Sequence, residues 1–136
     1  MLKVVTDTNI LISAYLFDKE PEKLLRMAKS KKISLFHSIE SLKEFKRVLK
    51  YNKFKLNNDE TSLIIEDYIS YSTLIKIKKK VDLIKTDKTD NMFLSIAENV
   101  NADIIISGDK HLLELKNKYK IDILNINEFF KMIETR

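Results

Sequence analysis

Short apolar runs rich in β-branched residues alternate along this chain with longer segments of helical periodicity, and this alternation restricts the fold more than any other feature. The runs at residues 2–6 and 33–36, and the Ile-Ile-Ile run within residues 103–107, are typical of strands buried on both faces. Further short strands are expected at residues 74–77 and 121–124. Strands that alternate with helices form right-handed βαβ units, so the sequence predicts an α/β protein with a mostly parallel sheet between helical layers.

Several of the expected helices carry recognisable start signals. Pro21 suits the first turn of a helix, and Ser38 can cap the helix that follows the second strand. The expected helices are residues 9–16, one opened by Pro21, one capped by Ser38, one from Asn58, one from Asp90, residues 110–119 and residues 127–135.

The composition is that of a soluble globular chain. Its 136 residues suit one domain, residues 1–136, and 44% hydrophobic with 33% charged residues argues against disorder. No apolar run reaches the ~20 residues that a membrane span needs, and the start of the chain lacks the layout of a signal peptide, so we expect a cytoplasmic protein without a membrane partner. The absence of cysteine excludes disulfides and thiol nucleophiles, and two histidines are too few for a multi-histidine metal site.

The net charge of +5 is compatible with a polyanionic partner but does not establish one. Basic runs at residues 29–32 and 76–80 are more often solvated surface than a nucleic-acid site.

Two acids directly follow predicted strands. Asp7 comes after residues 4–6, and Asp109 comes after residues 106–108. Ligands of open parallel sheets bind beyond the carboxyl ends of the strands, so both positions are candidates for a site. Gly108, the single glycine of the chain, allows a tight turn and a close backbone approach there. Helix capping by Asp109 is the structural alternative.

Other acids have simple structural interpretations. Asp90 stands at a helix start, where free N–H groups and the helix dipole favour a carboxylate. Asp87, three residues earlier, could cap the same helix or approach the same site. The helix after Ser38 offers Glu40 and Glu44, one turn apart, and periodicity favours a solvated position for either.

Four segments together resemble the PIN-domain nuclease family. They are residues 6–9, 38–45, 87–94 and 106–113, in the family's order and spacing over essentially the whole chain. The chain looks most similar to the short, single-domain PIN proteins described as toxin components of toxin–antitoxin pairs. The resemblance implies a three-layer α/β/α sandwich with a mostly parallel central sheet.

The same resemblance implies a magnesium- or manganese-dependent endoribonuclease. The family's acidic quartet, expected to be both catalytic and metal-binding, falls on Asp7, Glu44, Asp90 and Asp109. Asn9 would orient Asp7, and Ser107 matches a small hydroxyl residue near the last acid. Glu40 matches no quartet position.

One departure from the family pattern concerns basic groups. The sequence shows no obvious Arg or His near the quartet, and Lys110 and His111 are the nearest candidates. His111 is interpreted as a surface or packing residue.

The chemistry of phosphodiester hydrolysis explains why a nuclease site needs several carboxylates. It needs an activated water and neutralised charge on the phosphate and the leaving oxygen, which two divalent ions about 3.5–4 Å apart provide. Mg²⁺ or Mn²⁺ prefers carboxylate oxygens. Four crowded carboxylates repel one another without a cation, so at least one pKa should rise. With the four set aside, the 25 basic side chains exceed the remaining acids by nine, which suits RNA.

The expected partners are RNA, a small antitoxin and a second copy of the chain. Single-stranded RNA is favoured because exposed aromatics stack unpaired bases, although core packing is the preferred interpretation of each candidate, namely Phe17, Tyr51, Phe54 and Tyr119. The toxin resemblance implies a homodimer and an antitoxin segment that covers the acidic pocket. Residues 58–71 carry apolar side chains on more than one face, which fits a dimer or a helix buried on both sides.

Two rival functions belong to other classes. The first is a nuclease-fold protein that binds or scaffolds RNA with little catalytic activity. The second is a phosphatase-like enzyme of another doubly wound fold with Asp7 as nucleophile. It is disfavoured because Asn9, rather than a second acid, stands two residues on.

Overall fold

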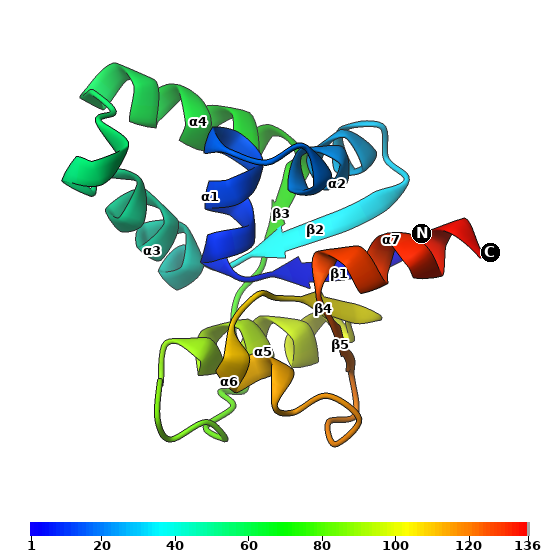
Figure 1. Cartoon of the computed structure of the whole chain (residues 1–136). Helices are drawn as coiled ribbons and strands as arrows, with labels where there is room; N and C mark the ends of the chain where they lie inside the picture. Colours follow the sequence, from blue (N-terminus) through cyan, green and yellow to red (C-terminus); the bar gives the residue numbers. More distant parts are fainter. Residues whose placement is uncertain (136) are drawn as a thin grey trace.

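Five short parallel strands form the centre of the fold. The computed structural model describes residues 1–135, and its sheet has the order β3-β2-β1-β4-β5 (Figure 1). The strands are β1 (Leu2–Thr6), β2 (Ile33–His37), β3 (Ser72–Leu74), β4 (Ile104–Ile106) and β5 (Asp122–Leu124). The central pair is in the register Val4↔Ile104 and Thr6↔Ile106, and all four pairings are parallel. The predicted α/β architecture is therefore confirmed.

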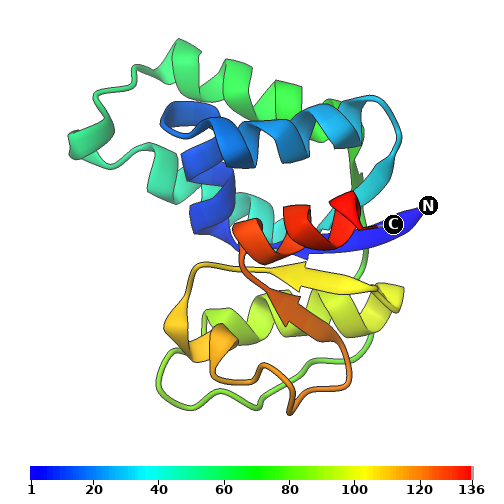
Figure 2. The same ribbon diagram turned by 45° about the vertical axis from the view of Figure 1, so that its right-hand side comes forward.

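Helices cover both faces of this sheet (Figures 1 and 2). They are α1 (Thr8–Leu16), α2 (Lys19–Lys29), α3 (Ile39–Leu49), the 3-10 helix η1 (Asn52–Phe54), α4 (Asn58–Tyr71), α5 (Asp90–Val100), α6 (Lys110–Leu113) and α7 (Ile126–Glu134). Alternate strand residues point to opposite faces, so Val4 packs with α1–α4 and α7, whereas Val5 packs with α5 and α6. Two hydrophobic cores, one on each face, result.

The predicted helix starts agree with the structure. Ser38 caps α3 through a reciprocal pair of hydrogen bonds with Ser41, and Asn57 and Glu60 do the same for α4. Pro21 lies in the first turn of α2, where the missing N–H costs nothing.

Two elements differ from the prediction. The helix expected at residues 110–119 ends at Leu113, and turns follow, with Asn117 in the left-handed region at φ 65°. The strand expected at residues 74–77 lies earlier, as β3 (Ser72–Leu74), which follows α4 directly and ends at Leu74 because its partner β2 ends opposite, at His37.

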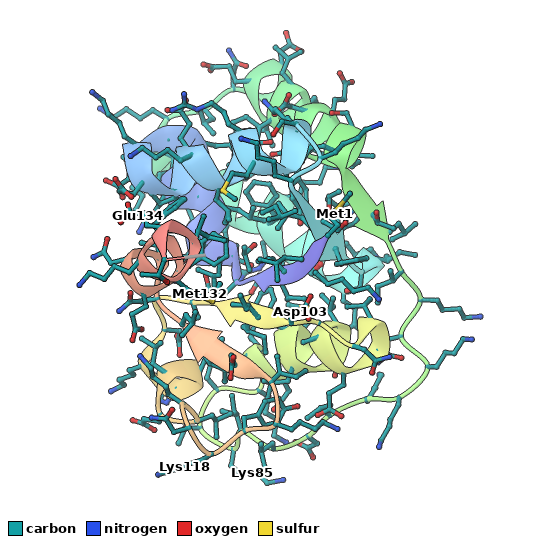
Figure 3. The ribbon with its side chains drawn as sticks, turned by 90° about the vertical axis from the view of Figure 1, so that its right-hand side faces the viewer. Met1, Lys85, Asp103, Lys118, Met132 and Glu134 are labelled. Atoms are coloured by element: carbon teal, nitrogen blue, oxygen red, sulfur yellow. The ribbon has the colours of Figure 1, made fainter. Side chains whose placement is uncertain are left out.

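A polar stripe on α5 holds the long segment 75–89 in place. The Asn91 amide oxygen accepts hydrogen bonds from the N–H groups of Leu83 and Ile84 (3.1 and 2.8 Å), and its NH₂ donates to the Ile84 carbonyl (2.8 Å). One and two turns later, Ser95 accepts from the backbone of residue 81, and Asn99 accepts from residues 78 and 79. The segment therefore has a fixed path without secondary structure of its own, and Lys85, labelled in Figure 3, extends from it at the outer edge of the molecule.

Among the helices of residues 1–135, none combines the length and the apolar character that a bilayer crossing requires.

Candidate active site

Asp7 lies at the carboxyl end of β1 and caps α1. Its side chain is 3% exposed, and its Oδ1 accepts a hydrogen bond from the Ile10 N–H at 2.9 Å. Its Oδ2 accepts from the Ser107 hydroxyl and from the Gly108 N–H. Burial raises the pKa of Asp7, whereas these three hydrogen bonds lower it in part. The carboxylate is thus held in one orientation at the edge of the sheet.

Ser107 connects Asp7 to Asp109. The Ser107 hydroxyl, fully buried at the end of β4, donates to Asp7 and accepts from the Asp109 N–H at 2.9 Å. Asp109 caps α6 through the His111 N–H at 2.8 Å, so capping is one of its roles. The neighbouring β1 and β4 therefore present their terminal acids together, as expected for the carboxyl ends of parallel strands.

Asp90, the first residue of α5, is a buried acid with an unsatisfied oxygen. It is 5% exposed, and its Oδ2 has no hydrogen-bond partner among residues 1–135. Burial, followed by the proximity of Asp109, Asp87 and Asp7, raises the pKa of Asp90 to about 8. Asp90 stands in the first turn of α5, where the helix dipole favours a carboxylate, although the N-cap position itself belongs to Thr89.

Asp87 joins the acids that the sequence singled out. One carboxylate oxygen from each of Asp87, Asp90 and Asp109 lies within 4.8 Å of the others. Asp87 comes from the segment that Asn91 anchors, and its Oδ1 also accepts from the Thr89 N–H at 3.1 Å. Sequence reasoning left Asp87 between a capping role and an approach to the site, and the structure places it in the cluster.

Glu44 reaches the same pocket from α3, but a basic residue that the sequence analysis missed is bonded to it. The Glu44 side chain is 16% exposed, and Arg47 donates to its Oε1 from Nε (2.8 Å) and from Nη2. The expectation that no Arg stands near the acids is therefore wrong. The three-residue spacing on a helix places the two side chains together, and this spacing was the available signal.

All four quartet acids line one pocket of about 290 Å³. Its other lining residues come from α1, the end of α3, the region of η1, the start of α5 and the segment before α5, and include Asn9, Arg47, Tyr51, Lys53, Phe54 and Asp87. Glu40 is exposed and does not line this pocket, so α3 directs Glu44 rather than Glu40 toward the other acids.

Two supporting residues have different outcomes. Ser107 binds Asp7 as described, whereas Asn9 is exposed at the rim of the pocket, and within the described residues Asp7 receives its hydrogen bonds from other groups. Asn9 therefore does not orient Asp7. His111 lies outside the pocket lining, with its Nδ1 3.2 Å from the Thr86 hydroxyl.

The position of Gly108 does not require a glycine on steric grounds, contrary to expectation. Its φ is not positive, and a Cβ added there would meet no atom within 4 Å. Its part in the site is its backbone N–H, which donates to Asp7 at 3.3 Å.

The family comparison agrees with this arrangement. The sequence model of the PIN domain matches residues 3–111, a stretch that contains all four quartet acids. This chain belongs to the PIN-domain family. PIN domains form a nuclease family whose members generally use divalent metal ions, so nucleic acid is the substrate class.

A solved structure has the same fold. The crystal structure of PAE2754 from Pyrobaculum aerophilum superimposes with a TM-score of 0.60, at 14% identity over 99% of this chain and 98% of that chain. No match was found among curated proteins.

The acids of this PIN domain suit a hard divalent cation. Carboxylate oxygens lying within 4.8 Å of one another can share one ion that reaches each at about 2.0–2.6 Å. The unpartnered Asp90 Oδ2 supplies a lone pair that no donor of the described chain uses. The raised pKa of Asp90 shows that its charged form is unfavourable beside the other acids, and a bound cation would remove this cost.

A larger cavity of about 740 Å³ adjoins the acidic pocket. The two share Glu44, Arg47 and Thr89, and the larger one runs between α3, the 77–82 segment and α5. Its wall includes the apolar side chains of Ile77, Val81 and Met92 and the basic side chains of Lys43, Lys80 and Lys88. We call this cavity the apolar groove.

Proposed function

We propose that this PIN domain, acting as one domain, is a divalent-metal-dependent endoribonuclease that hydrolyses RNA phosphodiester bonds. One observation carries the proposal. Four carboxylates from four separate segments, Asp7, Glu44, Asp90 and Asp109, line one pocket, and a buried oxygen of Asp90 has no donor.

The residues divide the chemical task. Asp87, Asp90 and Asp109, whose carboxylate oxygens lie within 4.8 Å of one another, would hold Mg²⁺ or Mn²⁺, with Asp7 and Glu44 completing the ligand set from the same pocket. The bound metal would activate water and neutralise charge on the phosphate. Ser107 and the Gly108 N–H keep the Asp7 carboxylate aimed into the pocket.

Single-stranded RNA is the proposed substrate. The acids lie in a pocket of about 290 Å³ rather than on an open face, which an unpaired strand enters more easily than a rigid duplex. Arg47 and Lys53 line the pocket beside the acids and provide positive charge for phosphates on either side of the scissile bond.

We further propose that this enzyme is the cytoplasmic toxin of a toxin–antitoxin pair. The apolar groove supports this role, because an antitoxin segment with apolar and charged side chains would fit its apolar wall and its mixed lysines and acids while covering Glu44 and Arg47. A homodimer is supported by α4, where Leu63 is 65% exposed and Ile69 is also exposed. The alternative of a helix buried on both sides is wrong.

A cleavage assay tests the catalytic proposal. Purified protein should cut a labelled single-stranded RNA with Mg²⁺ or Mn²⁺ and should stop when EDTA is added. Asp7→Asn should keep the fold, as judged by circular dichroism, and lose cleavage. RNA binding without cleavage in any metal would favour the scaffolding alternative, and hydrolysis of a small phosphomonoester instead of RNA would favour the phosphatase alternative. A strict monomer in light scattering at high micromolar concentration would contradict the homodimer.

A further inference from the structure

Aromatic rings continue from the acidic pocket to the outer surface. Tyr51 and Phe54 line the pocket, and their ring planes lie within 4° of parallel with centroids 6.4 Å apart. Phe17, at the end of α1, lies outside the pocket with its ring centroid 5.7 Å from that of Phe54. We call these three residues the aromatic strip.

Exposure distinguishes this strip from the core. Phe17 is 66% exposed and Tyr51 is 40% exposed, so the core interpretation of these two residues is wrong. Phe54 is half-buried against the core, and its ring lies near those of both Phe17 and Tyr51. Tyr119, the fourth candidate for base stacking, lies elsewhere and donates a hydrogen bond to Glu98.

Positive groups accompany the rings. The Arg47 guanidinium carbon is 5.5 Å from the centroid of the Tyr51 ring, and the Lys53 ammonium is 5.2 Å from that of Phe54. Arg47 also donates to the Tyr51 hydroxyl at 2.8 Å. A nucleotide carries a flat base and a negative phosphate, and here a ring and a cation lie within the reach of one nucleotide, twice in succession.

We propose that the aromatic strip is the binding track for the unpaired RNA that extends from the acidic pocket, with bases stacked on the rings and phosphates bound by Arg47 and Lys53. This inference rests on the proposed ribonuclease function and adds the direction of the strand, away from the apolar groove and across η1 to the end of α1. It follows that single strands long enough to reach Phe17 bind more tightly than shorter ones.

The occupant follows from the chemistry of the strip. Flat rings interleaved with cations recognise stacked bases joined by phosphates, and the strip is continuous with the pocket where a phosphodiester would be cut. A protein segment seated on the same rings is the competing occupant, and it would leave RNA affinity independent of Phe17.

Phe17 gives the sharpest test because it is exposed and lies outside the catalytic pocket. RNA affinity would be measured by fluorescence anisotropy in the Asp90→Asn background with EDTA, which removes cleavage from the measurement. Adding Phe17→Ala should weaken binding of a 12-nucleotide single strand about tenfold, as expected for the loss of one base–aromatic stack. Phe17→Tyr keeps the flat ring and should restore the affinity.

Matched controls separate stacking from other effects. Leu74→Ala removes an exposed apolar side chain of β3, which lines neither cavity, and should leave the affinity unchanged. Phe17→Ala should not affect a trinucleotide, which is too short to extend from the pocket to Phe17, or a 12-base-pair duplex, whose bases are unavailable. Equal affinities of the Phe17→Ala and Leu74→Ala proteins for the 12-nucleotide strand, or equal losses of affinity for the single strand and the duplex, would overturn the inference. Wild-type protein that binds RNA through Phe17 but never cleaves it would overturn the ribonuclease proposal alone.

Discussion

Arg47 donates two hydrogen bonds to a single carboxylate oxygen of Glu44, the acid that α3 contributes to the pocket. A cation of the protein therefore occupies one oxygen that a divalent ion would use. Arg47 is 60% exposed and also donates a hydrogen bond to the Tyr51 hydroxyl. It therefore has a second partner on the side of the pocket where we propose that RNA binds. A bound metal ion would thus draw Glu44 away from Arg47, and a bound RNA phosphate would draw Arg47 away from Glu44.

Removal of the Arg47 charge should strengthen metal binding and weaken RNA binding. Arg47→Met keeps the aliphatic stem, frees the Glu44 carboxylate and removes a positive charge that repels the ion. We expect several-fold tighter Mn²⁺ binding by calorimetry and weaker binding of single-stranded RNA. Lys46→Met is the matched control, because Lys46 is an exposed cation of the same helix that lines neither cavity. Equal effects of the two substitutions would show that only net charge matters.

Glu44 and Glu40 should differ sharply although they lie one turn apart. Glu44→Gln keeps the shape of the side chain but loses the charge that attracts a hard cation, so cleavage should fall about 100-fold or more and divalent-ion affinity should decrease. Glu40 is exposed outside the acidic pocket, and Glu40→Gln should change the unfolding free energy by less than about 0.5 kcal/mol with little effect on rate. The two variants would be assayed side by side across a Mg²⁺ titration. Loss of activity in Glu40→Gln alone would contradict the position of Glu44.

Asp90 should make the metal-free protein less stable as the pH rises. Its pKa is raised to about 8 in the fold from an ordinary value of 3.8, so the folded state holds a proton that the unfolded state has lost. The stabilisation from this group is complete below pH 4 and disappears as the pH rises through about 8. In EDTA, thermal unfolding of the wild type between pH 5 and pH 8.5 should show this loss, and Asp90→Asn should reduce it.

Two further measurements test the Asp90 explanation. Asp122→Asn, a change at an exposed acid of β5, should leave the pH dependence of the wild type intact. Mn²⁺ at pH 8 should stabilise the wild type more than Asp90→Asn, because ligand binding to the native state raises its stability. An identical pH dependence in the wild type and Asp90→Asn would refute the assignment.

The position of a residue could be predicted from the sequence where a single physical rule determines it. The carboxyl ends of parallel strands converge, so Asp7 and Asp109 could be placed together from their strands alone. Helix starts such as Ser38 were predictable because capping is a local interaction. The position of Asp90 could be read as a helix start, but its proximity to Asp109 depends on how α5 packs against the sheet.

The missed features depend on tertiary packing or on an interpretation by residue type. Core packing is the sequence-based interpretation of Phe17, yet Phe17 lies exposed at the end of α1, beside Phe54 of η1, a proximity that depends on tertiary structure. Gly108 was given a steric role that its ordinary φ does not need. The contact of Arg47 with Glu44 could be predicted from the sequence, because residues three apart are neighbours on a helix.

The polar stripe of α5 leads to the last prediction, that Asn91 controls metal affinity without binding metal. Its amide satisfies the backbone of Leu83 and Ile84, and this anchor fixes the segment that brings Asp87 to Asp90. Asn91→Ala leaves buried polar groups unpaired and should cost about 1–3 kcal/mol in urea unfolding. It should also weaken Mn²⁺ binding several-fold, because Asp87 is no longer held at the cluster.

Asn99→Ala provides the comparison for this experiment. Asn99 anchors the same segment two turns further along α5, at residues 78 and 79, far in sequence from Asp87. The Asn99→Ala protein should lose stability while its Mn²⁺ affinity stays near that of the wild type. If both variants lost metal affinity in proportion to stability, the effect would reflect general loosening of the fold. A selective loss in Asn91→Ala would instead assign the position of Asp87 to this one amide.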